Sequence, residues 1–232
     1  MGGKDKKMKK ITALALILIM ALSLASCNML GVGGGGEFSS KIVAMYNRST
    51  PTKSESVIVA EFQDNVLTTT TVIKSGMIDG KYAAATYERV EEELRTVSDG
   101  SNATKLDSIK QTTTVKEFLE GRGVRTNGGN WDPSLPNFSP KEGEITLNLS
   151  DTMIFNPKVD GNKMSFSVEG KNTKSVFGVD FGTIVSAVIE HDGASITSIK
   201  LEYVAPMTES LPATKFSVEI KYFYGIQNIT IG

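Results

Sequence analysis

Residues 216–222, Phe-Ser-Val-Glu-Ile-Lys-Tyr, decide the expected fold, because apolar and polar side chains alternate there without a break. Successive side chains of an extended strand point to opposite faces, so a period of two separates one apolar face from one polar face. The same alternation recurs over residues 145–149, 163–169 and 199–203. One dry face and one wet face are typical of an antiparallel sheet.

Three Asp-Gly pairs, at residues 79–80, 160–161 and 192–193, each separate two strand-like runs. An Asp-Gly pair tolerates the positive φ angles that tight hairpins require. The spacing of the pairs is irregular, which predicts hairpins and not a repeat architecture. In the first half of the chain, runs rich in Val, Thr and Tyr predict strands at 57–62, 66–73, 81–90 and 109–114.

Few helices are expected. Apolar residues at helical spacing over 38–46 predict one helix, with Ser39 and Ser40 available as caps. Two shorter helices are predicted at 115–120, ended by Gly121, and at 172–177, with Asn172 or Thr173 as the cap. Between them, the glycines and prolines of residues 127–140 predict a long loop or lid.

Eight or nine strands against about 25 helical residues predict a mainly β (α+β) fold. A sheet that wide must cover its apolar face. It can curve into an antiparallel half-barrel with a few short helices on the concave face, stack as a β-sandwich, or close into a barrel. The half-barrel is our expectation and the β-sandwich the alternative, and only the half-barrel leaves room for an apolar ligand.

Residues 1–26 have the pattern of a secretion leader. Five lysines within residues 4–10 precede an apolar run over 11–24, which is too short for a comfortable membrane span. The run ends in Leu24-Ala25-Ser26-Cys27, which resembles the lipobox of bacterial lipoproteins. That resemblance implies cleavage between Ser26 and Cys27 and attachment of a lipid, with acyl chains such as palmitate, to the Cys27 thiol. The alternatives are a plain signal peptide and an uncleaved anchor.

Cys27 is the only cysteine in the chain. A lone exported cysteine cannot form an intramolecular disulfide, and lipidation explains both its presence and its solitude. The glycine-rich residues 27–37 are expected to be a flexible tether, and residues 38–232 a single antiparallel β domain. We therefore expect an extracytoplasmic domain that is lipid-anchored to the bacterial cell membrane.

The charge balance excludes one class of partner. The whole chain has a net charge of −1 and the leader carries five lysines and one aspartate, so residues 27–232 carry −5. This mild acidity, with no basic stripe, argues against nucleic acid as a partner.

Residues that could carry catalysis are sparse. His191 is the only histidine, which excludes a zinc site built on two histidines, and we expect it to be a solvated residue beside a hairpin turn. Glu91, Glu92 and Glu93 cannot converge on one cation from a strand, where neighbours point to opposite faces, so a solvated edge or turn is expected. Residues 99–102 faintly resemble a calcium loop but lack its alternating ligands. The sequence predicts no enzyme, metal or cofactor.

Two features near the breaker-rich loop remain open. Trp131 could present a binding surface for a glycan ring or a bilayer, or fold back to cover the sheet, and we expect the second. Arg122 and Arg125 could hold an anion, although arginines in such a position are more often surface charges.

The order of lipobox, tether, leading helix, long meander and inserted short helices resembles the LolA/LppX group of lipoprotein and lipid carriers. That resemblance is architectural, spans most of residues 38–232, and implies a half-barrel whose concave face holds acyl chains. Residues 117–131 also look like uncharacterised lipoproteins of Gram-positive gut bacteria. That resemblance implies a cellular location and no activity. The expected function is binding of a lipid or other apolar ligand in the sheet's concavity. The alternative is a structural or adhesive surface module without a cavity.

Overall fold

The computed structural model describes residues 35–48, 50–63, 65–98, 104–141, 145–207 and 212–232. The predictions for the leader, the Ser26–Cys27 cleavage site, the first part of the tether and the calcium-like residues 99–102 lie outside the described residues. Helix α2 (Gly35–Arg48) begins within the range expected for the tether, three residues before Phe38.

The strands of the first half are β1 (Lys53–Phe62), β2 (Asn65–Ile78), β3 (Tyr82–Ser98), β4 (Thr104–Leu119) and β5 (Gly123–Thr126). Those of the second half are β6 (Ile154–Asp160), β7 (Lys163–Val168), β8 (Val185–His191), β9 (Ile196–Ala205) and β10 (Thr214–Phe223), with helix α3 (Gly170–Phe177) between β7 and β8.

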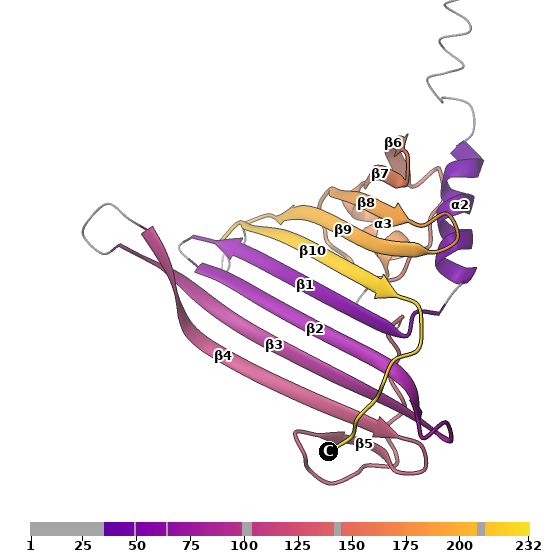
Figure 1. Cartoon of the computed structure of the whole chain (residues 1–232). Helices are drawn as coiled ribbons and strands as arrows, with labels where there is room; N and C mark the ends of the chain where they lie inside the picture. Colours follow the sequence, from indigo (N-terminus) through magenta and orange to yellow (C-terminus); the bar gives the residue numbers. More distant parts are fainter. Residues whose placement is uncertain (1–34, 49, 64, 99–103, 142–144, 208–211) are drawn as a thin grey trace, which may run out of the picture.

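The ten strands of the described residues form one antiparallel sheet in the order β5-β4-β3-β2-β1-β10-β9-β8-β7-β6 (Figure 1). Each half of the chain is a meander, and the pairing of the first strand with the last joins the two meanders. The sheet is curved and unclosed, with β5 and β6 at its edges. The expected mainly β fold, a curved antiparallel sheet with a few short helices on its concave face, is confirmed.

We call the face that bears the helices the inner face. Over β7–β10 this face is apolar, and α2, α3 and the extended residues 145–149 pack against it. Phe38 of α2 meets Phe166 of β7 edge to face, with ring centroids 5.9 Å apart. The alternating residues that predicted strands, Ile199, Leu201, Val218 and Ile220 among them, are therefore core residues.

Helix α3 confirms the prediction at 172–177 but starts earlier, at Gly170, after Glu169 as N-cap. The expected caps were wrong: Thr173 lies inside the helix, where its hydroxyl donates to the Gly170 carbonyl and accepts from the Phe181 amide. Gly178 ends the helix with a φ of 78°, a conformation that favours glycine. Ser39 and Ser40 likewise lie within α2 and do not cap it.

Two further predictions were wrong. Residues 115–120 do not form a helix: Val115 to Leu119 belong to β4, paired with β3 on one side and with β5 on the other from Lys116 onward. Hydrogen bonding to two neighbouring strands outweighs the local helical tendency, which is weak in a stretch this short. Residues 145–149 are extended as expected but lie outside the sheet, because Thr146 and Asn148 donate to carbonyls of α3.

Candidate functional site

Four aromatic side chains form a continuous row on the inner face, which we call the aromatic row: Phe177, Phe181, Tyr203 and Phe216. Successive ring centroids lie 6.0, 4.5 and 4.8 Å apart, and the last pair is stacked with an interplanar angle of 9°. Phe177, the last residue of α3, is fully buried, whereas Phe181, Tyr203 and Phe216 are half-buried. The row therefore leads from the closed core toward the part of the sheet that the helices do not cover.

The sheet register continues this row across the first half of the chain. Phe216 pairs with Ala60 of β1, Ala60 with Leu67 of β2, and Leu67 with Glu93 of β3. Glu93 in turn pairs with Lys110 of β4. Leu67 has 37% of its surface exposed. The inner face thus changes from aromatic to aliphatic to charged along a line that crosses the strands.

The inner face of β2–β4 is polar beyond that line. Thr69 and Thr71 face Glu91 and Arg89 of β3. The Arg89 guanidinium donates to the Glu91 carboxylate at 2.8 and 3.1 Å, and the Thr112 hydroxyl donates to the same carboxylate at 3.3 Å. Glu92 lies on the opposite face, as its alternation with Glu91 and Glu93 predicts. The expected edge or turn was wrong, because all three glutamates lie within β3, an interior strand.

The breaker-rich residues 127–140 form the predicted long loop, in which Asp132 bridges to Val124 of β5. Phe138 meets Tyr87 of the inner face edge to face at 6.0 Å, and Pro140 is fully buried. Lys141 then lies 4.7 Å above the ring of Tyr46 in α2. We call strands β1–β5 the open half of the sheet, because the helices pack on β7–β10, which belong to the covered half. The loop therefore links the end of the open half to the helices.

His191 is not the solvated residue that the sequence predicted. Its side chain is only 7% exposed, and the Gly193 amide donates to its Nδ1 at 3.0 Å. Asp192 accepts from the amides of Ser195 and Ala194, which lowers the pKa of this carboxyl. The Asp-Gly turn thus folds over the imidazole. The buried imidazole is therefore a structural part of the turn.

Two tyrosines close to this turn are held neutral. Burial raises the pKa of Tyr222, which is 5% exposed. Burial together with the charge of Asp192 raises the pKa of Tyr224 to about 12, and its hydroxyl donates to the Ile196 carbonyl at 2.6 Å. Both shifts favour the neutral phenol.

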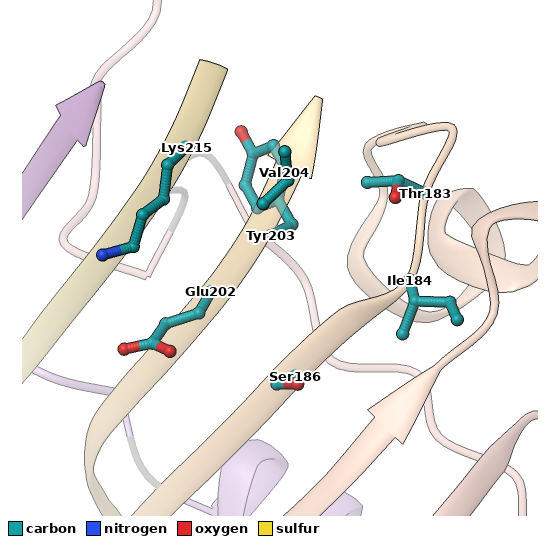
Figure 2. Close-up of a pocket in the computed structure, with 7 residues that line it drawn as sticks. All are labelled: Thr183, Ile184, Ser186, Glu202, Tyr203, Val204 and Lys215. Atoms are coloured by element: carbon teal, nitrogen blue, oxygen red, sulfur yellow. The ribbon is translucent and has the colours of Figure 1, made fainter. Parts of the chain in front are cut away.

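An open pocket of about 300 Å³ lies where β8 and β10 begin and β9 ends (Figure 2). Lys215 and Glu202 stand on one side of it, and Thr183 and Ile184 on the other. Ile184 and Val204 are more than half exposed. Ligand sites usually enclose most of their ligand. This opening does not, so the pocket is a weaker candidate than the aromatic row.

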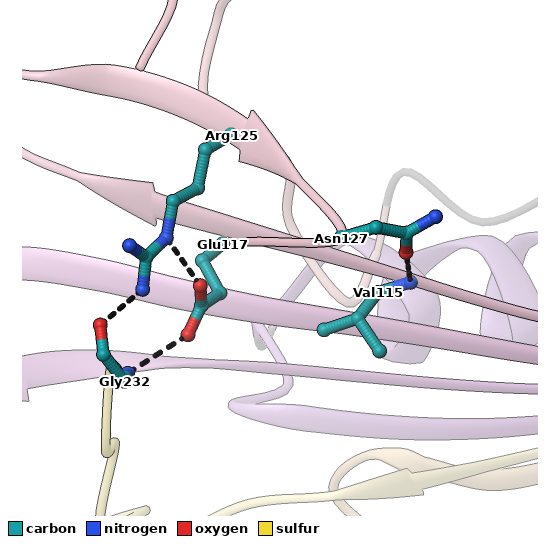
Figure 3. A network of polar contacts seen from close by, with 5 residues as sticks. All are labelled: Val115, Glu117, Arg125, Asn127 and Gly232. Atoms are coloured by element: carbon teal, nitrogen blue, oxygen red, sulfur yellow. Dashed lines mark hydrogen bonds and ion pairs between the residues drawn. The ribbon is translucent and has the colours of Figure 1, made fainter. Parts of the chain in front are cut away.

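The two arginines beside the loop differ. Arg122 is exposed, whereas the Arg125 guanidinium bonds the Glu117 carboxylate at 2.5 Å (Figure 3). The Arg125 guanidinium also lies 4.7 Å from the ring of Trp131. The amide of Gly232 donates to the second oxygen of Glu117 at 3.1 Å. The Arg125 and Gly232 bonds lower the pKa of Glu117 although burial opposes them. Trp131 is half-buried against Arg125 and does not form an exposed patch.

Sequence reasoning missed part of this geometry. Tyr203 and Phe216 belong to strands that it identified, but Phe181 carries no periodic signal, since it lies in a loop. Among the described residues no cluster of three or more His, Cys, Asp or Glu could hold a metal ion. No helix in the described part of the chain is long and apolar enough to cross a membrane.

No protein-family model matches this chain, and no curated protein matches it.

Proposed function

We propose that this chain is an extracytoplasmic lipoprotein, anchored to a bacterial membrane through lipid on Cys27, that holds a lipid or other apolar ligand against its inner face. The proposed ligand lies on the end of the aromatic row, over Phe216, Ala60 and Leu67. The observation that carries the proposal is that half-buried aromatic rings continue the core beyond the helices that cover it.

The row supports an apolar ligand for an energetic reason. Removing apolar surface from water stabilises by about 25 cal/mol per Å², and aromatic rings offer large contact areas. Tyr203, Phe216, Ala60 and Leu67 lie on four adjacent strands. At about 4.8 Å per strand they span roughly 14 Å. A flexible hydrocarbon chain laid across them would extend the existing core without moving α2 or α3.

Ligand binding can be tested with a leaderless chain, residues 28–232, which retains every described residue. Organic extraction of the purified chain followed by mass spectrometry should recover a lipid. A fluorescent fatty acid should bind, and Phe216→Ser should weaken its binding about tenfold, which corresponds to about 1.4 kcal/mol.

Phe223→Ser is the matched control, because Phe223 lies on the same strand but on the opposite face and is 38% exposed. It should leave the dissociation constant unchanged. If the chain yields no lipid and binds no fatty acid, the ligand proposal is wrong; equal effects of the two variants would place the ligand elsewhere.

The anchor has its own test. In the full chain expressed in a bacterium, labelled palmitate should be incorporated, and Cys27→Ser should abolish both the label and membrane retention. Ser23→Ala, within the leader but outside the cleavage site, is the control. Labelling that persists in Cys27→Ser would contradict lipidation at this residue.

A second candidate function is a structural or adhesive surface module. It is favoured by the size of the core. Among the described residues, nineteen buried apolar side chains from α2, α3, residues 145–149 and β7–β10 form one packed cluster. This candidate predicts that no lipid is recovered and that the Phe216→Ser variant changes stability alone.

A further inference from the structure

The last residues of the chain lie across the outer face of the open half. After β10 the chain turns at residues 224–225 and runs down past β1 toward β5 (Figure 1). The Thr52 hydroxyl donates to the Gly225 carbonyl at the start of this segment. Residues 226–232, which we call the tail, then alternate between exposed and half-buried side chains. We call the part of the outer face that the tail covers the seat.

The seat contains residues with little or no side chain, which lets the tail lie close to the sheet. Gly76 of β2 pairs with Ala84 of β3, so both residues face outward, and the tail lies against Gly76. Ala84 is only 1% exposed. A Cβ atom on Gly76 would lie 2.9 Å from the Gln227 carbonyl oxygen and 3.2 Å from Ile229 Cγ1. Any larger residue at position 76 would therefore push the tail away from the sheet.

The far end of the seat holds the tail by its backbone. Glu117 of β4 accepts a hydrogen bond from the Gly232 amide, and Arg125 of β5 donates to the Gly232 carbonyl group (Figure 3). The two clamping side chains are mostly buried, with 13% and 16% of their surface exposed, and they bond each other. Backbone contacts are available to any extended peptide, so the clamp does not depend on the side chains it holds.

The start of the tail is suited to exchange. Gly225 has a φ of 149°, which permits a sharp change of direction there, and the apolar side chain of Ile226 is 98% exposed. We propose that the seat formed by Gly76, Ala84, Glu117 and Arg125 is a peptide-binding site, and that the tail of a second copy of this chain replaces the resident tail in it. The exchange would use the same contacts in both states, as segment swapping does. This proposal is independent of lipid binding.

The test uses two full-length variants of the leaderless chain. In Ile229→Asp the resident tail is released and the seat stays intact. In Gly76→Val the seat is blocked and the tail stays intact. Mixed together, the two variants should form a one-to-one complex whose mass, measured by light scattering, is twice that of either variant alone. Thr70→Val, on the same strand and face as Gly76 but six residues from it, takes the place of Gly76→Val in the control mixture. Because its own seat still holds its tail, it should form much less complex with Ile229→Asp.

Trp131 supplies a second readout that does not need a stable complex. It is the only tryptophan in the chain, and it packs on the guanidinium that holds Gly232. A synthetic peptide of residues 224–232 should shift the emission of the Ile229→Asp variant in a saturable way and leave that of Gly76→Val unchanged. No complex and no shift at millimolar peptide would overturn the proposal, because the tail would then bind only its own chain. Folding of each variant is checked by its circular dichroism spectrum.

Discussion

The two halves of this sheet share one hydrogen-bonded ladder but are stabilised differently. In the covered half, inner residues of β9 such as Ile199 and Leu201 are fully buried beneath helices. In the open half, the corresponding positions of β3 are Arg89 and Glu91, which bond each other. The open half has the longer strands, with 14, 17 and 16 residues in β2, β3 and β4. Cross-strand pairing extends a sheet, but only a packed second layer makes it a core.

No helix packs on the inner face of the open half, although the short side chains of Thr69 and Thr71 in β2 are buried there. The two segments that cover this half lie at its lower end. There the loop 127–140 covers the inner face at Tyr87 through Phe138, and the tail covers the outer face at Gly76. Phe118 of the inner face and Leu119 of the outer face are correspondingly half-buried. The comparison predicts that core substitutions weaken the whole molecule, whereas changes in the open half act locally through these two covers.

The largest difference should appear when one isoleucine is truncated in each half. Ile199→Ala should lower the free energy of unfolding by about 2–5 kcal/mol, because a fully buried side chain leaves a cavity. Ile109→Ala in β4, where the side chain is 52% exposed, should change it by about 0.5 kcal/mol or less. Chemical denaturation of both variants measures the contrast. Equal losses would mean that the open half is as tightly packed as the covered one.

A smaller effect is expected where the loop joins the open half. A Cβ atom on Gly123 would lie 2.0 Å from the Asp132 carbonyl oxygen, which accepts a hydrogen bond from the Val124 amide. Gly123→Ala should therefore cost about 1–3 kcal/mol and detach the loop. Hydrogen exchange at Val124 and Asp132 is the measurement. Gly121→Ala is the control: its φ is also positive, at 80°, but its Cβ would meet no neighbour. If both variants behave alike, backbone strain and not the loop contact is responsible.

The contacts of Glu117 and Arg125 with Gly232, which we call the tail clamp, should weaken in acid. The pKa of Glu117 in the folded chain lies below its ordinary value of 4.5, so the ionised carboxylate stabilises the folded clamp. This contribution is complete above pH 4.5 and is lost as the pH falls through the lower folded value. Emission of Trp131 should therefore change below pH 4.5. The change should be absent in Glu117→Gln, and a variant that keeps it would show that another group titrates.

The smallest effect is expected from ion pairs on the outer face. Lys200 of the covered half lies 3.3 Å from Glu219, and both side chains are at least one-third exposed. Lys200→Met should change the free energy of unfolding by less than about 1 kcal/mol. Lys110→Met should do the same in the open half, where this exposed side chain lies on the inner face. A large loss from Lys200→Met alone would mean that the covered half depends on surface charge as well as on its core.

Much of the fold followed from short-range pattern. Alternation over 163–169, 199–203 and 216–222 predicted β7, β9 and β10, and the turn at Asp79-Gly80 forms with φ angles of 52° and 63°. Residues 115–120 were misassigned because their spacing fits a helical turn as well as a strand, and only the pairing with β3 and β5 distinguishes the two. For His191, the adjacent Asp-Gly turn indicated exposure, whereas its backbone folds over the ring.

The candidate site was less accessible to sequence reasoning. Phe181 joins the aromatic row from a loop, so no periodicity marks it. Gly76 matters because the tail, some 150 residues later in the chain, lies against it. Such contacts depend on the path of the chain and leave no local pattern.

The sequence by itself determined that this chain forms a wide antiparallel sheet with few helices, because side-chain alternation and turn chemistry are local properties that backbone geometry fixes residue by residue. Only the tertiary structure decided which part of that sheet becomes a core. Burial depends on what packs against a face, and here two short helices and one extended segment reach half of it. The other half is left to a loop, a tail and the end of an aromatic row.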